Sequence, residues 1–276
     1  MEKIECVIMD WAGTAVDYGC FAPVAAFVES FKAIGAPVTA AETRAHMGLT
    51  KIEEIRELFA IEHVSADFHA KHGREWNEED VRKCYEMFQE VLFQSLEDYS
   101  TPIPGVVETM KELCGQGIKI GSTTGYTRQM MDVVIPAAAK MGYVIDNCVT
   151  SDNLPGGRPK PYMIFQNMQE MEISSPRSVV KVGDTIADIK EGVNAGAWSV
   201  GVILGSNELA LTEEEVSAMP TTELRERMKA VRYKMYAAGA DYVMDDITEL
   251  PLLIESMKTP VRDKNINKKV GNLANI

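Results

Sequence analysis

The sequence has few cysteines and no long apolar run, and both shortages narrow the choice of fold. Its five cysteines are an odd number, and no two have the Cys-x-x-Cys spacing, so neither a disulfide scaffold nor a zinc site is expected. No apolar run approaches the roughly 20 residues that cross a bilayer, which excludes a membrane-spanning helix. The cysteines are Cys6, Cys20, Cys84, Cys114 and Cys148.

Positive charge is also scarce. The sequence has 28 lysines and arginines against 41 aspartates and glutamates, a formal net charge of -13. Such an acidic surface argues against nucleic acids and anionic membranes as partners, because both require basic patches. A small anionic substrate needs positive charge only locally. The first residues, MEKIECVIMDW, lack the apolar segment of a secretory signal, so a cytoplasmic protein is expected.

The order of the predicted elements indicates an α/β fold. A length of 276 residues fits one main domain with a smaller insertion. From about residue 100, short apolar strands alternate with helices, which is typical of a doubly wound parallel sheet that binds ligands at the carboxyl ends of its strands. Strands are predicted at residues 4–9, 118–122, 143–150, 178–182, 199–204 and 242–244.

Helical signals dominate the segment between the first strand and the second. Residues 18–99 contain no convincing strand, so we expect them to form an inserted all-helical cap domain. The core domain is then discontinuous and consists of residues 1–17 and 100–258. Residues 259–276 are predicted to be a polar C-terminal tail.

Within the predicted cap, Thr50 and Glu53 have the spacing of a capping box, which predicts that a helix begins after Thr50. Residues 78–96 repeat apolar side chains at helical spacing and are predicted to form a long amphipathic helix. Residues 63–77 show no clear period and are predicted to be a connection.

Three aspartates follow predicted strands and could form a catalytic and metal-binding group. Asp10 ends the first strand, and Asp184 follows the strand at 178–182, with Asp188 four residues further on. If Asp188 lies in the first turn of a helix, both of the later aspartates can face one cation. Oxygen ligands of this kind favour Mg²⁺, and a metal lets a carboxylate attack an anionic phosphoryl group to form an acyl phosphate.

Hydrogen-bond donors are predicted close to these acids. The segment STTG at residues 122–125 ends another strand with hydroxyl groups, and Arg158 and Lys160 lie in a loop rich in glycine and proline. Hydroxyls and cations at the carboxyl edge of a sheet can bind phosphoryl oxygens. All these groups together predict a phosphoryl-transfer site.

This set of motifs, over residues 1–17 and 100–258, resembles the haloacid dehalogenase superfamily. In that superfamily the first aspartate is the nucleophile, and a second aspartate two positions later usually protonates the leaving group. Here the second position is Ala12. The resemblance therefore implies that the leaving group departs from carbon or is activated in another way.

A more detailed resemblance, over nearly the whole chain, is to the phosphonoacetaldehyde hydrolase family. It implies hydrolysis of the carbon–phosphorus bond of phosphonoacetaldehyde through a Lys51 imine and an Asp10 aspartyl phosphate, with Mg²⁺ as cofactor and a homodimer formed through the cap. The segments that carry it are DWAGT (10–14), VDYGCFAP (16–23), MGL (47–49) with KI (51–52), IGSTTGYTR (120–128), KVGDT (181–185) and VGVILGS (200–206).

The same resemblance assigns roles to individual residues. Asp10 and Lys51 are the implied catalytic residues. The implied Mg²⁺ ligands are Asp10, the backbone carbonyl of Ala12 and Asp184, with Asp188 either a ligand or a support. The implied substrate-binding residues are Thr124 and Arg158 for the phosphoryl oxygens, and Met47, Cys20 and Tyr126 at the border of the pocket.

The chemistry of the bond agrees with an imine at Lys51, although most lysines are solvated surface residues. Cleavage of the carbon–phosphorus bond would expel a carbanion, whereas a protonated imine accepts the electrons and departs as an enamine. The amine must be neutral to attack the aldehyde. Lys51 is predicted at the first position of a helix, where the helix dipole and burial under a closed cap both favour the neutral amine.

One departure and several alternatives stay open. Glu54 stands where the family has a histidine that assists proton transfer; a carboxylate could shuttle protons but also favours a charged Lys51. The main alternative is a phosphomonoesterase of the same superfamily acting on a small phosphorylated metabolite, which Ala12 disfavours. Asp184 and Asp188 disfavour a metal-free dehalogenase, and an intact nucleophile disfavours a non-catalytic phosphate-binding module.

Overall fold

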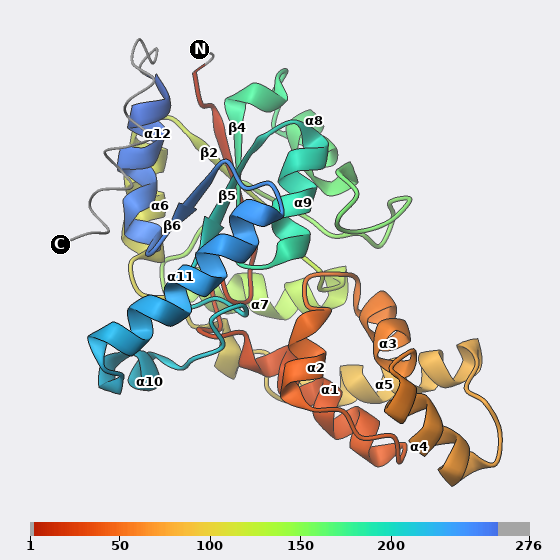
Figure 1. Ribbon diagram of the computed structural model, residues 1–276. Helices are drawn as coiled ribbons and strands as arrows, with labels where there is room; N and C mark the ends of the chain where they lie inside the picture. Colours follow the sequence, from red (N-terminus) through yellow and green to blue (C-terminus); the bar gives the residue numbers. More distant parts are fainter. Residues whose placement is uncertain (1–2, 259–276) are drawn as a thin grey trace.

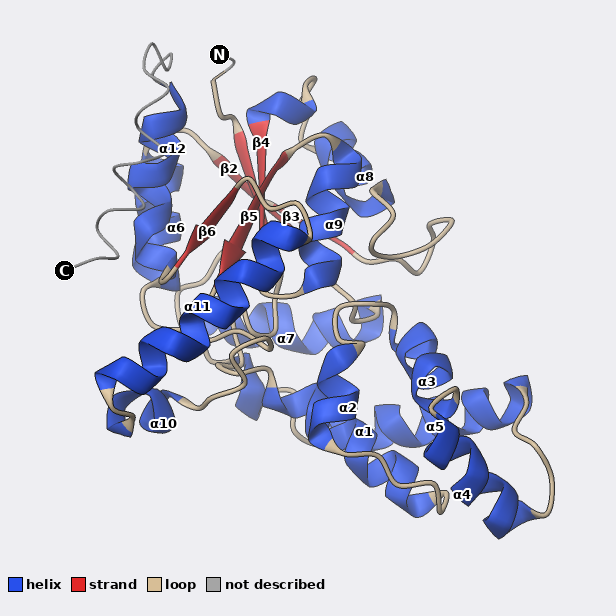
Figure 2. Ribbon diagram, viewed as in Figure 1, coloured by secondary structure: helices blue, strands red, loops and turns tan. Residues whose placement is uncertain are grey.

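The computed structural model describes residues 3–258, and a six-stranded parallel sheet forms the centre of this part of the chain (Figures 1 and 2). The strand order is β3-β2-β1-β4-β5-β6, and all neighbouring strands are parallel. This is the order of a doubly wound sheet, so the predicted fold class is confirmed. The strands are β1 (Cys6–Met9), β2 (Lys119–Thr123), β3 (Asn147–Val149), β4 (Val179–Gly183), β5 (Trp198–Val202) and β6 (Tyr242–Met244).

β1 lies inside the sheet because all four of its residues are apolar and buried. Val7 of β1 pairs with Ile120 of β2 on one side and with Val180 of β4 on the other. A parallel strand is covered on both faces, which explains its uninterrupted apolar sequence. Because the strands share one direction, the residues that follow β1, β2 and β4 meet at one edge, here called the carboxyl edge.

Helices cover both faces of the sheet (Figure 2). α6 packs with α12 on one face, and α8 packs with α9 on the other, where α11 also contacts α9. The helices of this part are α6 (Val106–Gly115), α7 (Arg128–Lys140), α8 (Tyr162–Glu170), α9 (Ile186–Ala195), α10 (Glu213–Ala218), α11 (Thr221–Ala237) and α12 (Leu250–Lys258). Three short 3-10 helices are η1 (Asp98–Ser100), η2 (Pro176–Ser178) and η3 (Ile247–Glu249).

The first five helices after β1 form a bundle beyond the carboxyl edge (Figure 1, orange). An aromatic core holds the bundle together: the Phe27 and Phe88 rings stack at 4.2 Å, and Phe59 lies 4.9 Å from Phe31 and 5.3 Å from Trp76. Such ring pairs add to the large apolar area that they bury. The helices are α1 (Phe21–Ala33), α2 (Ala40–Ala45), α3 (Lys51–Phe59), α4 (Glu62–His72) and α5 (Glu78–Phe93).

The sequence predicts the strands better than it predicts the bundle. All six predicted strands are found, with ends that differ by a few residues. The prediction of a connection at residues 63–77 is wrong, because α4 occupies most of it. Only Val64 and Phe68 of α4 are buried, too few for a visible period, and Gly73 ends the helix with a φ of 71°. The predicted tail at 259–276 lies outside the described residues.

Candidate active site

The carboxyl edge of the sheet and the loops around α2 and α3 enclose a small pocket with about 290 Å³ of empty space. The sheet and the helical bundle both contribute to its wall, so the fold brings distant segments together. In the described part of the chain, no helix is long and apolar enough to cross a membrane. Eight residues that the sequence singles out line the pocket: Asp10, Ala12, Cys20, Met47, Lys51, Thr124, Tyr126 and Arg158.

Asp10 directly follows β1 and is fixed against β4. Its backbone N–H donates to the carbonyl of Val182 at 3.0 Å. Arg158 Nη2 donates to Oδ1 of Asp10 at 2.7 Å, with both side chains buried. Burial raises the pKa of Asp10, and the nearby Arg158 opposes that shift. A buried carboxylate oriented by one guanidinium is well placed to act as a nucleophile.

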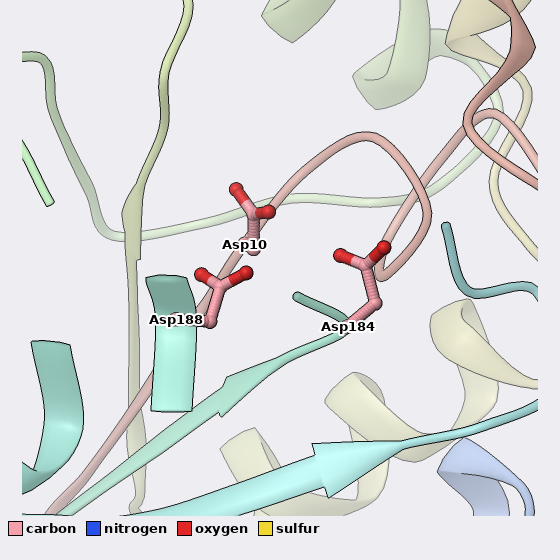
Figure 3. Close-up of side chains that lie close together, drawn as sticks. All are labelled: Asp10, Asp184 and Asp188. Atoms are coloured by element: carbon pink, nitrogen blue, oxygen red, sulfur yellow. The ribbon is translucent and has the colours of Figure 1, made fainter. Parts of the chain in front are cut away.

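Three buried carboxylates meet beside the pocket (Figure 3). Asp10, Asp184 and Asp188 each place one oxygen within 4.8 Å of the others. Asp184 accepts from Thr14 Oγ1 at 2.7 Å and from the Asn207 N–H at 2.8 Å, and within the described residues no cationic side chain forms an ion pair with it. Burial and the neighbouring carboxylates raise the pKa of Asp184 well above its usual range. Buried oxygens with unbalanced charge suit a hard divalent cation.

Asp188 differs from Asp184 because two cations already surround it. Its Oδ2 accepts from Oγ1 of Thr185 at 2.6 Å in the capping box that begins α9. Its Oδ1 lies 2.9 Å from Lys181 Nζ and 3.1 Å from Arg158 Nη1. Burial would raise the pKa of Asp188, but the two cations lower it to about 2. Asp188 is therefore ionised and held firmly in position.

Two charged residues of this network, Lys181 and Glu191, are not among those that the sequence analysis identifies. Arg158 donates from Nε to Glu191 at 3.1 Å and from Nη2 to the carbonyl of Thr123 at 2.7 Å. Lys181 donates to Oγ1 of Thr123 at 3.0 Å. The sequence contains a signal for both residues. Lys181 interrupts the apolar strand β4, and Glu191 lies on the buried side of α9. Together they hold the Arg158 guanidinium beside the pocket.

Lys51 is the first residue of α3 and is buried in the pocket wall. The Glu53 carboxylate accepts from the N–H of Thr50 at 3.3 Å and from its Oγ1 at 2.6 Å, so the helix begins where the capping box predicts. The Lys51 Nζ lies 5.4 Å from the ring centre of Phe27 and 5.7 Å from that of Tyr126. Aromatic faces at this range favour a positive charge on the nitrogen.

Glu54 is the closest ionic partner of Lys51. Its Oε1 and Oε2 lie 3.0 and 2.9 Å from Nζ, and the Gly48 N–H also donates to Oε1 at 3.0 Å. Burial raises the pKa of Glu54 to about 7, although Lys51 and the Gly48 N–H work against the shift. Met47 Sδ lies 3.5 Å from the same Nζ. The pocket therefore contains an amine next to a carboxyl that titrates near neutral pH.

The other predicted pocket residues are neutral. Burial raises the pKa of the Cys20 thiol and of the Tyr126 phenol well above their usual values. Thr124 follows β2, and its Oγ1 accepts from the Tyr126 N–H at 3.0 Å. Lys160, which the sequence places near Arg158 as a second phosphate-binding cation, is exposed and does not line the pocket.

Comparison with known proteins connects this site to a family. The model for haloacid dehalogenase-like hydrolases matches residues 4–196. A phosphonoacetaldehyde hydrolase of Bacteroides fragilis is 56% identical over 255 residues, which cover 92% of this chain and 97% of that protein. The phosphonoacetaldehyde hydrolase of Bacillus cytotoxicus is 51% identical, over 92% of this chain and 96% of that protein.

Solved structures agree with the sequence matches. A phosphonoacetaldehyde hydrolase-like protein from Oleispira antarctica has a TM-score of 0.90 and 36% identity, over 93% of each chain. A β-phosphoglucomutase from Clostridium difficile has a TM-score of 0.66 and 15% identity, over 92% of this chain and 97% of that one, which shows the fold alone. With its sequence matches at 51% and 56% identity, this chain belongs to the phosphonoacetaldehyde hydrolase family of the haloacid dehalogenase-like hydrolases.

Proposed function

We propose that this enzyme hydrolyses the carbon–phosphorus bond of phosphonoacetaldehyde to acetaldehyde and phosphate. The observation that carries the proposal is that Lys51, from the helical bundle, lines the same pocket as Asp10, from the sheet. A phosphomonoesterase uses a carboxylate nucleophile but has no need of a buried amine beside it. Ala12 supports the same choice, because it leaves no acid two residues after Asp10 to protonate an alkoxide.

The first step is condensation of the Lys51 amine with the aldehyde. Glu54, with its pKa near 7, takes a proton from the Lys51 ammonium, and the neutral amine attacks the carbonyl carbon. Glu54 then returns this proton to the hydroxyl of the carbinolamine, which departs as water and leaves a protonated imine. The faces of Phe27 and Tyr126 stabilise its positive charge.

The second step breaks the carbon–phosphorus bond. The Asp10 carboxylate attacks phosphorus, the bonding electrons move into the imine, and an enamine departs, leaving an aspartyl phosphate. Arg158 and Thr124 bind the phosphoryl oxygens and offset the charge that develops on them. Because the imine receives the electrons, no acid is required at position 12.

Two hydrolyses return the enzyme to its starting state. Water attacks the aspartyl phosphate, which releases phosphate and restores the Asp10 carboxylate. The enamine takes a proton on its terminal carbon. This proton balances the one that water gives up in attacking the aspartyl phosphate, and Glu54 can carry it. Water then hydrolyses the resulting imine, which releases acetaldehyde and frees the Lys51 amine. The complete cycle consumes one water molecule per substrate.

The carboxylate cluster fits Mg²⁺ as the cofactor. Asp10, Asp184 and the backbone carbonyl of Ala12 would hold the ion, and Asp188 would either join them or orient the site from α9. The raised pKa of Asp184, which forms no ion pair within the described residues, supports this fit. When bound, the ion reduces the repulsion between the nucleophilic carboxylate and the anionic phosphoryl group.

The same proposal extends to the organisation of the chain. Residues 1–17 and 100–258 would form the core domain, and residues 18–99 would form a cap domain that opens to admit substrate and closes for the reaction. A homodimer formed through the cap and a cytoplasmic location are proposed from the family resemblance and from the composition.

The proposal is tested by phosphate release from phosphonoacetaldehyde with Mg²⁺, with and without borohydride, for the wild type and Lys51→Arg. We expect release from the wild type, loss of release after borohydride, and no release from the variant. No release from phosphonoacetaldehyde, together with turnover of simple phosphate esters by both proteins, would replace the proposal with a superfamily phosphomonoesterase.

A further inference from the structure

A single guanidinium nitrogen connects the helical bundle to the core. Arg44, in the last turn of α2, donates from Nη1 to the carbonyl of Gly19 at 2.7 Å and to Oδ1 of Asn207 at 3.0 Å. Asn207 also donates to Arg44, from its Nδ2 to the carbonyl of Arg44 at 3.1 Å. The two residues thus hydrogen-bond in both directions, one from the bundle and one from the loop after β5. The carbonyl of Gly19 belongs to the segment that connects β1 to α1.

Asn207 also contacts the proposed metal site. The residue is 2% exposed, and its backbone N–H donates to Oδ2 of Asp184 at 2.8 Å. Its side chain therefore faces Arg44 of the bundle while its backbone holds a carboxylate of the core. Because different atoms serve the two contacts, a substitution of the side chain can remove the first and spare the second.

The contact lies a short distance from Lys51 along the chain. The carbonyl of Arg44, which accepts from Asn207, also accepts from the Met47 N–H at 3.3 Å. Met47 Sδ in turn lies 3.5 Å from Lys51 Nζ. Fixing Arg44 against the core therefore fixes the turn that leads into α3 and carries the amine to the pocket.

The boundary between bundle and core has little spare room around this turn. A Cβ on Gly48 would lie 2.4 Å from Oγ1 of Thr185, and a Cβ on Gly125 would lie 2.6 Å from the carbonyl oxygen of Leu49. Backbones pack here at distances that only glycine permits. The close approaches at Gly48 and Gly125 define the position of the bundle narrowly. A specific polar contact is needed to hold the bundle in that position.

We propose that Arg44 and Asn207 form a clamp that holds α2 and α3 against the carboxyl edge, with Lys51 in its reactive position. Arg44 is then a positioning residue for imine formation and acts through Met47 and the turn before α3. The imine readout below rests on the proposed function, whereas cap closure is measured independently of it.

The test compares Arg44→Ala, Asn207→Ala and the double variant with a matched control, Arg56→Ala. Arg56 also lies on the bundle, but its ion pair, at 2.9 Å, is with Glu78 of the same bundle. Hydrogen exchange of residues 44–50 reports closure, and the rate of borohydride trapping with phosphonoacetaldehyde reports the position of the amine. Unfolding midpoints serve to separate loss of the clamp from loss of the fold.

We expect each clamp variant to exchange residues 44–50 about tenfold faster than the control and to trap the imine about tenfold more slowly, as expected for loss of a hydrogen bond to a charged group. The double variant should match the single ones, because either change opens the clamp. Arg44→Lys should recover part of the trapping rate, since one nitrogen makes the contacts to Gly19 and Asn207 and an ammonium has three donors.

Exchange and trapping rates in Arg44→Ala and Asn207→Ala that equal those of Arg56→Ala would overturn the clamp. Fully additive effects in the double variant would also overturn it, because the two side chains would then act separately. If the wild type forms no imine, the proposed function fails, and the exchange measurement alone then decides the clamp.

Discussion

The ion pair of Lys51 and Glu54 is almost completely shielded from water, with 5% and 1% of the two side chains exposed. In such a setting the opposite charges attract strongly. Burial, however, raises the pKa of Glu54 from 4.5 to about 7, which makes it a better proton acceptor than an ordinary glutamate. In the proposed mechanism the proton moves within this pair, so Glu54 would act at the position where the family resemblance implies a histidine.

Glu54→Gln should slow imine formation about 100-fold, the usual scale for loss of a general base. The amide keeps the size of the side chain and can still accept a hydrogen bond from Lys51, so the fold should survive. Glu54→His should recover much of the rate, because histidine is the family residue and also titrates near neutral pH. Borohydride trapping rates measure both changes. A glutamine variant that traps as fast as the wild type would exclude Glu54 from the proton transfer.

The same pair predicts the pH dependence of the reaction. The proton acceptor is the ionised form of Glu54, and its raised pKa means that this form is lost as the pH falls through about 7. We therefore expect kcat/KM to decrease below about pH 7, instead of below the lower value typical of exposed glutamates. A pH profile of the wild type checks this, with Glu54→Gln as the control that should lack this limb. A decrease that begins only near the ordinary glutamate pKa would assign the limb to another group.

At this scale the sequence predicts the residues at strand ends and misses the charges that support them. Asp10 and Thr124 could be placed because residues that follow neighbouring parallel strands share one edge. Lys51 could be assigned only through the family resemblance, since no spacing links the bundle to the sheet. Lys181 and Glu191 are missed because the burial of a charge depends on its partners. Glu191 lies 3.1 Å from Arg158 and 3.4 Å from Lys181, and only the tertiary structure brings these residues together.

Among the elements, the strands could be predicted because each is a short apolar run, and glycine or polar residues commonly bound it. α4 could not, because a buried aromatic side chain holds it against another helix: Phe68 packs on Phe59 of α3 at 5.5 Å. The packing of the bundle against the sheet also could not be predicted from the sequence, because it depends on close approaches at glycines.

Gly125→Ala should prevent complete closure. The new Cβ would lie 2.6 Å from the carbonyl oxygen of Leu49, a backbone atom that cannot rotate away, and Gly125 itself has no positive φ to add strain. We expect kcat/KM to fall at least about tenfold, a scale typical of small misplacements in an active site, with little change in the unfolding midpoint.

The matched control is Gly115→Ala at the end of α6, where a Cβ would meet nothing within 4 Å. This change should leave kcat/KM unaltered and can raise stability slightly, because alanine favours a helix more than glycine does. Equal activities for the two variants would show that the close approach of Gly125 and Leu49 is not needed for catalysis.

For the whole molecule, the site is divided between the bundle and the sheet. The aromatic cluster around Phe59 lies in the bundle, and its side chains belong to the same continuous hydrophobic core as Val7 and Val180 of the buried strands. In the proposed mechanism the bundle supplies the amine and the sheet supplies the nucleophile, so a movement of the bundle against the sheet would bring the two groups together or separate them. The clamp at Arg44 and the close approach of Gly125 to Leu49 both lie at the boundary between the bundle and the sheet.

The free energy of unfolding should depend on Mg²⁺, because burial and mutual repulsion disfavour the ionised carboxylates of this cluster, above all Asp184, and a bound cation would offset both effects. At about 100 times its Kd, the ion should raise the unfolding midpoint on the order of 5 °C relative to EDTA. Asp184→Asn should unfold at a higher temperature than the metal-free wild type and show no rise with Mg²⁺. An exposed aspartate of α4, Asp67, provides the control variant Asp67→Asn, which should keep the full rise. Calorimetry with and without Mg²⁺ measures all of these midpoints, and an undiminished rise in Asp184→Asn would place the ion away from the carboxyl edge.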